Sequence, residues 1–188
     1  MSSAIAATHT ERQGAGLIGL WGWDSLPVQA DLEGVPGLSP AQAGWRPNLP
    51  PMGDPTHELP AALPDLAAPS AEVLVSGPLD GGQRQVSLRL RSESPHLWVL
   101  IPAARLAGWS LGTLPEVPAV GERHAILMSG LLPEGEPLEL TVLGEEPVEV
   151  ELRASSPLLN EELRALERAL PAHVVLWPEV ARSTTLSL

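Results

Sequence analysis

Within the stretch 84–92, residues 85–91 alternate strictly between polar and aliphatic side chains. The aliphatic positions are Val86, Leu88 and Leu90, and Gln, Ser and Arg residues stand between them. A period of two places the aliphatic side chains on one face of a β-strand and the polar side chains on the other. The next run, 97–101, is apolar at every position, which is typical of a strand covered on both faces. The pattern therefore predicts two consecutive strands in the middle of the chain.

Similar short runs recur at a spacing of roughly ten residues through the second half of the chain. They predict further strands at 72–76, 106–111, 123–129, 138–142, 148–152, 173–177 and 183–188. The runs at 138–142 and 148–152 carry glutamates at alternate positions, and we interpret them as a hairpin with one acidic face. A helix is predicted after Asn160, a good N-cap that two glutamates follow, and Pro171 ends it.

The first third of the chain has a different character. Ten prolines fall between Pro27 and Pro69, and proline removes a backbone donor and fixes φ. We expect residues 1–69 to form an arm or linker, partly extended, with Trp21, Trp23 and Trp45 docking it rather than staying in water. A short helix, interrupted by glycines, is an alternative for 4–23. The predicted fold is mainly β: an antiparallel, jelly-roll-like β-sandwich over 70–188 with one late α-helix and a proline-rich N-terminal arm.

Composition excludes several classes of function. The 188 residues include no Phe, Tyr, Lys or Cys, and the lack of cysteine excludes disulfides and thiolate metal sites. A formal charge of −12 argues against binding to nucleic acid or to an anionic membrane surface. The apolar run 14–23 is about half of a bilayer span and follows no basic segment. We expect a soluble chain without a signal peptide, a transmembrane span or direct membrane insertion.

One motif indicates hydrolase chemistry. Gly108-Trp-Ser-Leu-Gly112 matches the G-x-S-x-G elbow, in which a strand-to-helix turn exposes a nucleophilic serine. His124 and His173 follow Ser110 and are the bases that a serine hydrolase would use. However, the prolines after Gly112 disfavour a long helix, so a strand that ends at a glycine turn is the favoured interpretation. A serine hydrolase that uses Ser110 stays as the alternative.

The histidines do not form a metal-binding motif. The closest pairs with a carboxylate are His9 with Glu11 and His57 with Glu58, and neither belongs to an H-E-x-x-H pattern. The chain also contains neither a Walker loop nor a glycine-rich dinucleotide motif. No metal and no other cofactor is therefore predicted.

Ten carboxylates between Glu134 and Glu167 raise the question of calcium. They are spread over predicted strands, turns and a helix, without the aspartate-rich loop that binds this ion. We interpret them as a solvated acidic face. The cross-strand partners expected for it are Arg89, Arg91 and Arg153.

Several segments resemble a known family. Residues 84–92, the Ser94-Pro95 turn and the run Ile101–Ser110 are similar to the C-terminal, membrane-external β-domain of integral-membrane zinc aminopeptidase-like proteins, the M-twenty-eight peptidase family. The tail resembles the same domain in Leu170-Pro-Ala-His173, Trp177-Pro178 and 183–186. The resemblance covers residues 70–188.

The resemblance implies a fold and a role without implying catalysis. Family members carry their zinc ligands in a separate domain, on motifs such as H-x-D, whereas His9 here is followed by Thr-Glu. It therefore implies a non-catalytic accessory or protein-interaction domain on the extracytoplasmic side of a membrane. Its partner would be a peptidase or membrane domain, or a second copy of the chain. Trp98 and Trp109 are expected to anchor the core or an interface, with core packing favoured for both.

Overall fold

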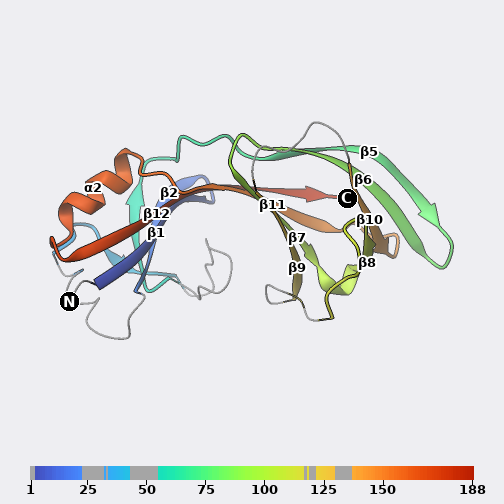
Figure 1. The fold of residues 1–188 in the computed structure, drawn as a ribbon, viewed down its shortest axis with the longest axis horizontal. Helices are drawn as coiled ribbons and strands as arrows, with labels where there is room; N and C mark the ends of the chain where they lie inside the picture. The colour runs from blue at the N-terminus through green and yellow to red at the C-terminus, as the bar shows by residue number, and fades with distance from the viewer. Residues whose placement is uncertain are drawn as a thin grey trace. The chain divides into compact units, whose positions relative to one another are not determined.

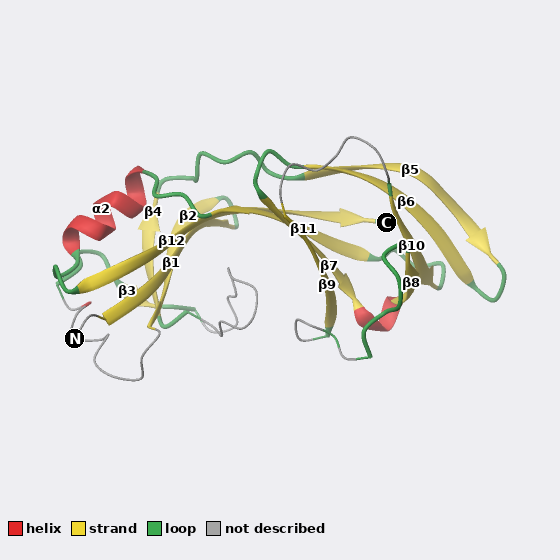
Figure 2. Cartoon of the chain, viewed as in Figure 1, coloured by secondary structure: helices red, strands yellow, loops and turns green. Residues whose placement is uncertain are grey.

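The computed structural model describes residues 3–22, 32, 34–42, 55–116, 118, 122–129 and 137–188. Strands predominate in the described chain, and the helix α2 follows late in the sequence (Figure 2). The mainly β, sandwich-like fold predicted from the sequence is confirmed. The chain divides into two compact units. Unit 1 comprises Met1–Leu66 and Ser155–Arg182, and unit 2 comprises Ala67–Ala154 and Ser183–Leu188.

Unit 1 contains the strand order β3-β4-β2-β1-β12. The neighbours β3 and β4, β4 and β2, and β2 and β1 are antiparallel, whereas β1 and β12 are parallel, with Ile5 opposite Leu176. That parallel pair is an exception to the antiparallel arrangement expected. The elements are β1 (Ser3–Arg12), β2 (Ala15–Gly22), β3 (Ser39–Pro40), β4 (His57–Ala61), α2 (Glu161–Ala169) and β12 (Val174–Ser187), of which the last residues belong to unit 2.

The N-terminal residues form a β-hairpin, which differs from the arm and from the short helix considered above. Gln13 and Gly14 join β1 to β2 with φ values of 52° and 83°, the region that two-residue hairpin turns require. Strand β4 lies within the proline-rich stretch and pairs with β2. Trp21 lies in β2 and is 5% exposed, so it is a buried residue of a sheet and not part of an extended arm. Trp23 and Trp45 lie outside the described residues.

The helix α2 follows Asn160 as predicted, and it packs on the sheet of unit 1, which the sequence did not predict (Figure 1). The Oδ1 atom of Asn160 accepts the backbone N–H of Leu163 at 3.1 Å and caps the helix. Leu163 and Leu166 are buried at the centre of its inner face. The same core contains buried residues of β1, β2 and β12, and two residues that follow β2 in the chain. They are Ile5, Ala7, Ile18, Leu20, Leu32, Val35 and Val180.

Unit 2 is the sandwich proper. One sheet has the order β5-β6-β10-β8, and the facing strands run β12-β11-β7-β9. Apolar side chains from both sheets meet in one core, among them Leu88 and Leu140 from the first and Val99 and Leu152 from the second. The elements are β5 (Ser70–Leu79), β6 (Gln83–Arg91), β7 (His96–Pro102), the 3₁₀ turn η1 (Ala103–Arg105), β8 (Leu106–Trp109), β9 (Arg123–Ser129), β10 (Leu138–Leu143) and β11 (Glu149–Ser156).

Two details of the predicted strand arrangement are wrong. The runs 138–142 and 148–152 do not pair as a hairpin, because β10 pairs with β6 and β8 while β11 lies between β12 and β7 in the other sheet. Both strands send alternate apolar side chains into one core, so either arrangement satisfies the pattern. The runs 173–177 and 183–188 belong to a single strand, β12, which continues through Pro178.

Candidate functional site

Ser110 lies where β8 ends, on the outer face of its sheet. The preceding Trp109 packs against the core, so the alternation of the strand turns Ser110 the other way. The Ser110 hydroxyl accepts the backbone N–H of Glu139 at 3.2 Å, and the Ser110 N–H donates to the Glu139 carbonyl at 2.9 Å. A bridge joins Trp109 to Gly112, and residues 113–116 are not helical. The motif is therefore a strand end with a tight turn and lacks the helix of an elbow.

His124 points to the inside of the sandwich. It lies opposite Ile101 in β9, is 6% exposed, and packs edge-on against Trp109 with 5.9 Å between ring centroids. The ring thus lies with the core-facing Trp109, while Ser110 faces the other side of that sheet. His173 is exposed, in the turn before β12, and belongs to unit 1 rather than to the unit of Ser110. The structure does not assemble the Ser110–His124 pair that a hydrolase would need.

The two tryptophans considered as anchors have different environments. Trp109 is partly buried and packs against the core of unit 2. Its indole nitrogen and Nδ1 of His124 are both buried without a hydrogen-bond partner, so shape rather than polar bonding holds the pair. Trp98 is half-buried on β7, opposite Leu127, which is 47% exposed on β9. Core packing therefore accounts for Trp109, and Trp98 borders the surface.

The described residues contain no group of three or more histidine, aspartate or glutamate side chains that converge as a metal site. Of the sequence pairs, His57 contacts the Thr56 hydroxyl at 3.0 Å through Nδ1. Its neighbour Glu58 is engaged with Arg12. In the same described part of the chain, no helix is long and apolar enough to cross a bilayer.

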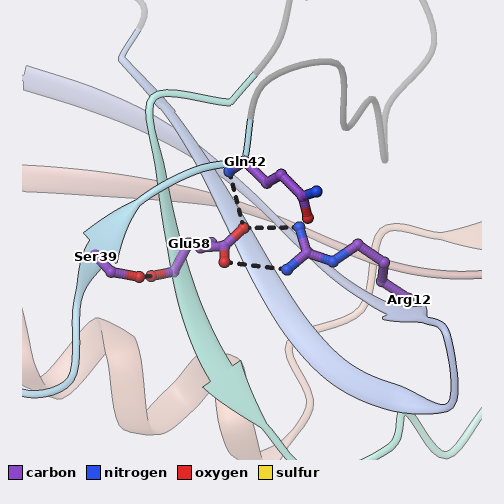
Figure 3. Close-up of polar contacts among 4 residues, drawn as sticks. All are labelled: Arg12, Ser39, Gln42 and Glu58. Carbon is purple, nitrogen blue, oxygen red and sulfur yellow. Dashed lines mark hydrogen bonds and ion pairs between the residues drawn. The ribbon is translucent and has the colours of Figure 1, made fainter.

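Arg12 and Glu58 form a bidentate ion pair in unit 1 (Figure 3). Two guanidinium nitrogens reach the two carboxylate oxygens at 2.9 and 3.1 Å, and the backbone N–H of Gln42 donates to one of those oxygens at 3.2 Å. The hydrogen bond from Arg12 is the main cause that lowers the pKa of Glu58 below its ordinary value of 4.5; desolvation opposes it. Ser39 bonds the Glu58 carbonyl at 3.4 Å. The cluster holds the end of β1 against β4, and both carboxylate oxygens of Glu58 accept hydrogen bonds within it.

Ion pairs involve carboxylates of the acidic face, Glu146 and Glu151, and also Glu72 outside it. Glu72 on β5 accepts Arg89 at 3.2 Å and Arg91 at 3.4 Å, and these side chains are more than half exposed. Glu151 accepts Arg123 at 2.6 Å. Arg153, also expected as a cross-strand partner, is 3% exposed and therefore does not lie on a solvated face. Exposed pairs such as those of Glu72 contribute about 0–1 kcal/mol each.

His9 is the centre of a buried polar network in unit 1. It is 1% exposed, with Nε2 at 2.7 Å from the carbonyl oxygen of Ala62 and Nδ1 at 2.7 Å from the side-chain amide nitrogen of Asn160. Gly16 makes room for that carbonyl, because a Cβ at this position would lie 1.8 Å from the Ala62 oxygen. The network joins β1, the chain after β4 and the N-terminus of α2.

The edge strand β5 exposes several apolar side chains in unit 2. It pairs with β6 along one side and is the first strand of its sheet, so no described strand pairs with its other side (Figure 1). None of its ten residues is buried. Val73, Val75 and Leu79 are 47%, 56% and 42% exposed.

No family model matches the chain, and no curated protein matches it. The site residues therefore have to be judged on their geometry. Sequence reasoning identified Ser110 and His124, which the structure does not bring together, and His173, which belongs to the other unit. It missed both the open edge of β5 and the His9 network. The exposed valines of β5 could have been noticed in the sequence, but the open edge depends on the strand order.

Proposed function

We propose that this chain is a non-catalytic protein-interaction module that associates through the free edge of β5 with the same edge of a second copy. The observation that carries the proposal is the ten-residue strand with an open backbone edge and three exposed aliphatic side chains. An unpaired edge offers a row of backbone donors and acceptors to an incoming strand. Strand addition at such an edge is a common mode of protein recognition.

Charge supports a second copy as the partner. The whole chain carries −12, which opposes association of two copies at most surfaces. Residues 70–91, which form the β5–β6 hairpin, carry three arginines and two acidic residues, a formal +1. Two hairpins can therefore approach without the repulsion expected elsewhere. Pro78 lacks an N–H, so we place the added strand at 70–76.

The relation to the membrane zinc peptidases is a second part of the proposal. The residues that carry the resemblance lie mainly in β6, the β7–β8 region and β12. On this view the chain is an accessory domain on the extracytoplasmic side of a membrane, and a peptidase domain is the alternative partner. An immunoblot of source cells tests it. A band far heavier than 19.9 kDa in the membrane fraction supports the relation. A soluble band near 19.9 kDa contradicts it.

Sedimentation equilibrium over a range of concentrations tests the self-association. We compare the unaltered chain with Val75→Lys, which places a charge at the middle of the open edge, as natural edge strands do to prevent pairing. Leu158→Lys is the matched control, because Leu158 is 53% exposed and lies outside β5. We expect the unaltered chain and the control to dimerise alike, and Val75→Lys to weaken the dimer by about tenfold or more.

Two results would refute self-association at β5. One is a monomer at every concentration, which would leave a peptidase domain as the partner to test. The other is a dimer that Val75→Lys leaves intact, which would place the contact elsewhere. Hydrogen exchange adds a local measurement, because the amides of β5 should gain protection as the dimer forms, whereas those of the interior strand β10 should not change.

A further inference from the structure

The two groups that flank the His9 ring select one of its protonation states. A carbonyl oxygen only accepts, so the Ala62 carbonyl requires a proton on Nε2. Asn160 uses Oδ1 to accept the Leu163 N–H, which leaves its NH₂ group to donate to Nδ1 of His9. The neutral ring with its proton on Nε2 is therefore the form that satisfies all three residues around it.

A second proton, on Nδ1, would set two donors against each other. The Asn160 amide can turn over and offer Oδ1 to the charged ring, but Oδ1 then no longer accepts the Leu163 N–H. Protonation therefore breaks either the bond between His9 and Asn160 or the N-cap of α2. In both cases the change falls on the first turn of the helix.

Several of the charged side chains on the elements around His9 are paired with other groups. On β1 and β12, Glu11 accepts Arg182 at 2.7 Å, and Arg182 also donates to the Pro64 carbonyl at 3.4 Å. The positive end of the α2 dipole disfavours an imidazolium at this place. Strand β2 has no ionisable side chain. The other ionisable groups on the described elements packed around His9 fall into two sets. The sheet and the chain after it carry Arg12, His57, Glu58, Asp65 and Glu179, and α2 carries Glu161, Glu162, Arg164, Glu167 and Arg168.

We propose that His9 is a pH-sensitive latch on α2, a role separate from the interaction proposed for β5. The neutral ring ties the N-terminus of α2 to β1 and to the chain at Ala62. Protonation releases that end of the helix and gives water access to the apolar residues beneath it. The residues of the sheet that become accessible are Ile5, Ala7, Ile18, Leu20 and Val180.

The latch is tested on the whole chain by two measurements. Long-range proton–nitrogen NMR of the imidazole at about pH 7.5 gives the tautomer, which we expect to be Nε2–H. Amide exchange of α2, corrected for intrinsic rates, is then followed from about pH 7.5 to 5. We expect protection of the first turn of α2 to fall about fivefold or more, the size of a lost cap. Binding of a hydrophobic dye should rise in parallel.

Asn160→Asp is the decisive variant. A carboxylate can cap the helix with one oxygen and accept a hydrogen bond from the Nδ1–H of the charged ring with the other, so the first turn should keep its protection in acid. His9→Gln supplies an amide donor for the Ala62 carbonyl without titrating, and it should also remove the pH dependence. His173→Gln is the matched control, since His173 is exposed before β12, and it should behave like the unaltered chain.

Three results would overturn the latch. They are an Nδ1–H tautomer at neutral pH, protection of α2 that does not change with pH, and an Asn160→Asp variant that loses protection as the unaltered chain does. The tautomer is read on the unaltered chain, so the proposal can be refuted even where a variant fails to fold. The result is also independent of β5, because Val75→Lys should leave the pH dependence of α2 unchanged.

Discussion

Replacing Gly16 by alanine should destabilise unit 1 far more than the loss of a glycine usually does. The new Cβ would lie 1.8 Å from the Ala62 oxygen, 2.3 Å from its carbonyl carbon and 2.7 Å from the Ala61 oxygen. All three are backbone atoms, so no side chain can turn aside. Ordinary contacts begin at 3.4 Å, and the carbonyl must therefore retreat by about 1.6 Å.

A movement of that size breaks the bond between His9 and Ala62. It leaves a buried donor without a partner, which costs about 1–3 kcal/mol, and disturbance of the Gly16–Ala61 pairing adds about 1 kcal/mol. We expect Gly16→Ala to lower the free energy of unfolding by about 2–4 kcal/mol. Gly77→Ala is the control, because Gly77 also lies in a strand but a Cβ there meets nothing within 4 Å.

Urea unfolding, together with amide exchange of β1 and β2, measures the effect. The control should stay within about 1 kcal/mol of the unaltered chain, since alanine reduces the entropy of the unfolded state. The reasoning is refuted if Gly16→Ala unfolds at the same urea concentration as the control and the amides of β1 and β2 keep their protection. That outcome would mean that the chain after β4 can move away from β2 at little cost.

Two further changes test the polar groups described above. Glu58 has a lowered pKa in the folded chain, so its contribution to stability is present above the ordinary value of 4.5 and is lost as the pH falls through the folded value. Glu58→Gln should therefore be less stable than the unaltered chain at about pH 6, with a difference that shrinks towards about pH 3 in urea unfolding; a constant difference would contradict the assignment to Arg12. Ser110→Ala removes one exposed hydrogen bond and should cost at most about 1 kcal/mol, with no loss of any p-nitrophenyl ester turnover. Turnover that disappears in this variant would revive the hydrolase alternative.

The strands of unit 2 could be predicted because each strand has its own alternation of apolar and polar residues. Val86, Leu88 and Leu140 alternate with polar neighbours, and this alternation is local information. Which of the two sheets a strand joins depends on residues that are distant in the sequence. Strands β10 and β11 have the same pattern and a glycine-containing connection, yet their partners come from other parts of the chain. The helix α2 was predictable because its cap, its acidic first turn and its leucines lie within a dozen residues.

Unit 1 was harder to predict because its hairpin is rich in alanine and glycine, which favour strands weakly. Its pairing depends on distant residues, since Thr8 bonds Glu179 across 171 positions of the chain. The same holds for the His9 network. Ala62 and Asn160 are 53 and 151 residues from His9, and neither marks itself as a partner in the sequence. A motif search finds groups that are close along the chain, whereas this network is close in space alone.

The shared strand β12 sets the order in which the chain can fold during synthesis. Residues 174–180 provide the parallel partner of β1, and residues 183–188 belong to unit 2. Neither unit can be completed before this segment has left the ribosome, although the hairpin β1–β2 emerges first. Until then the apolar residues that β12 covers remain exposed to water, which favours aggregation and slow folding. A chaperone that holds the nascent chain would therefore help both units at once, and fusions or truncations that disturb residues 174–188 should impair them together.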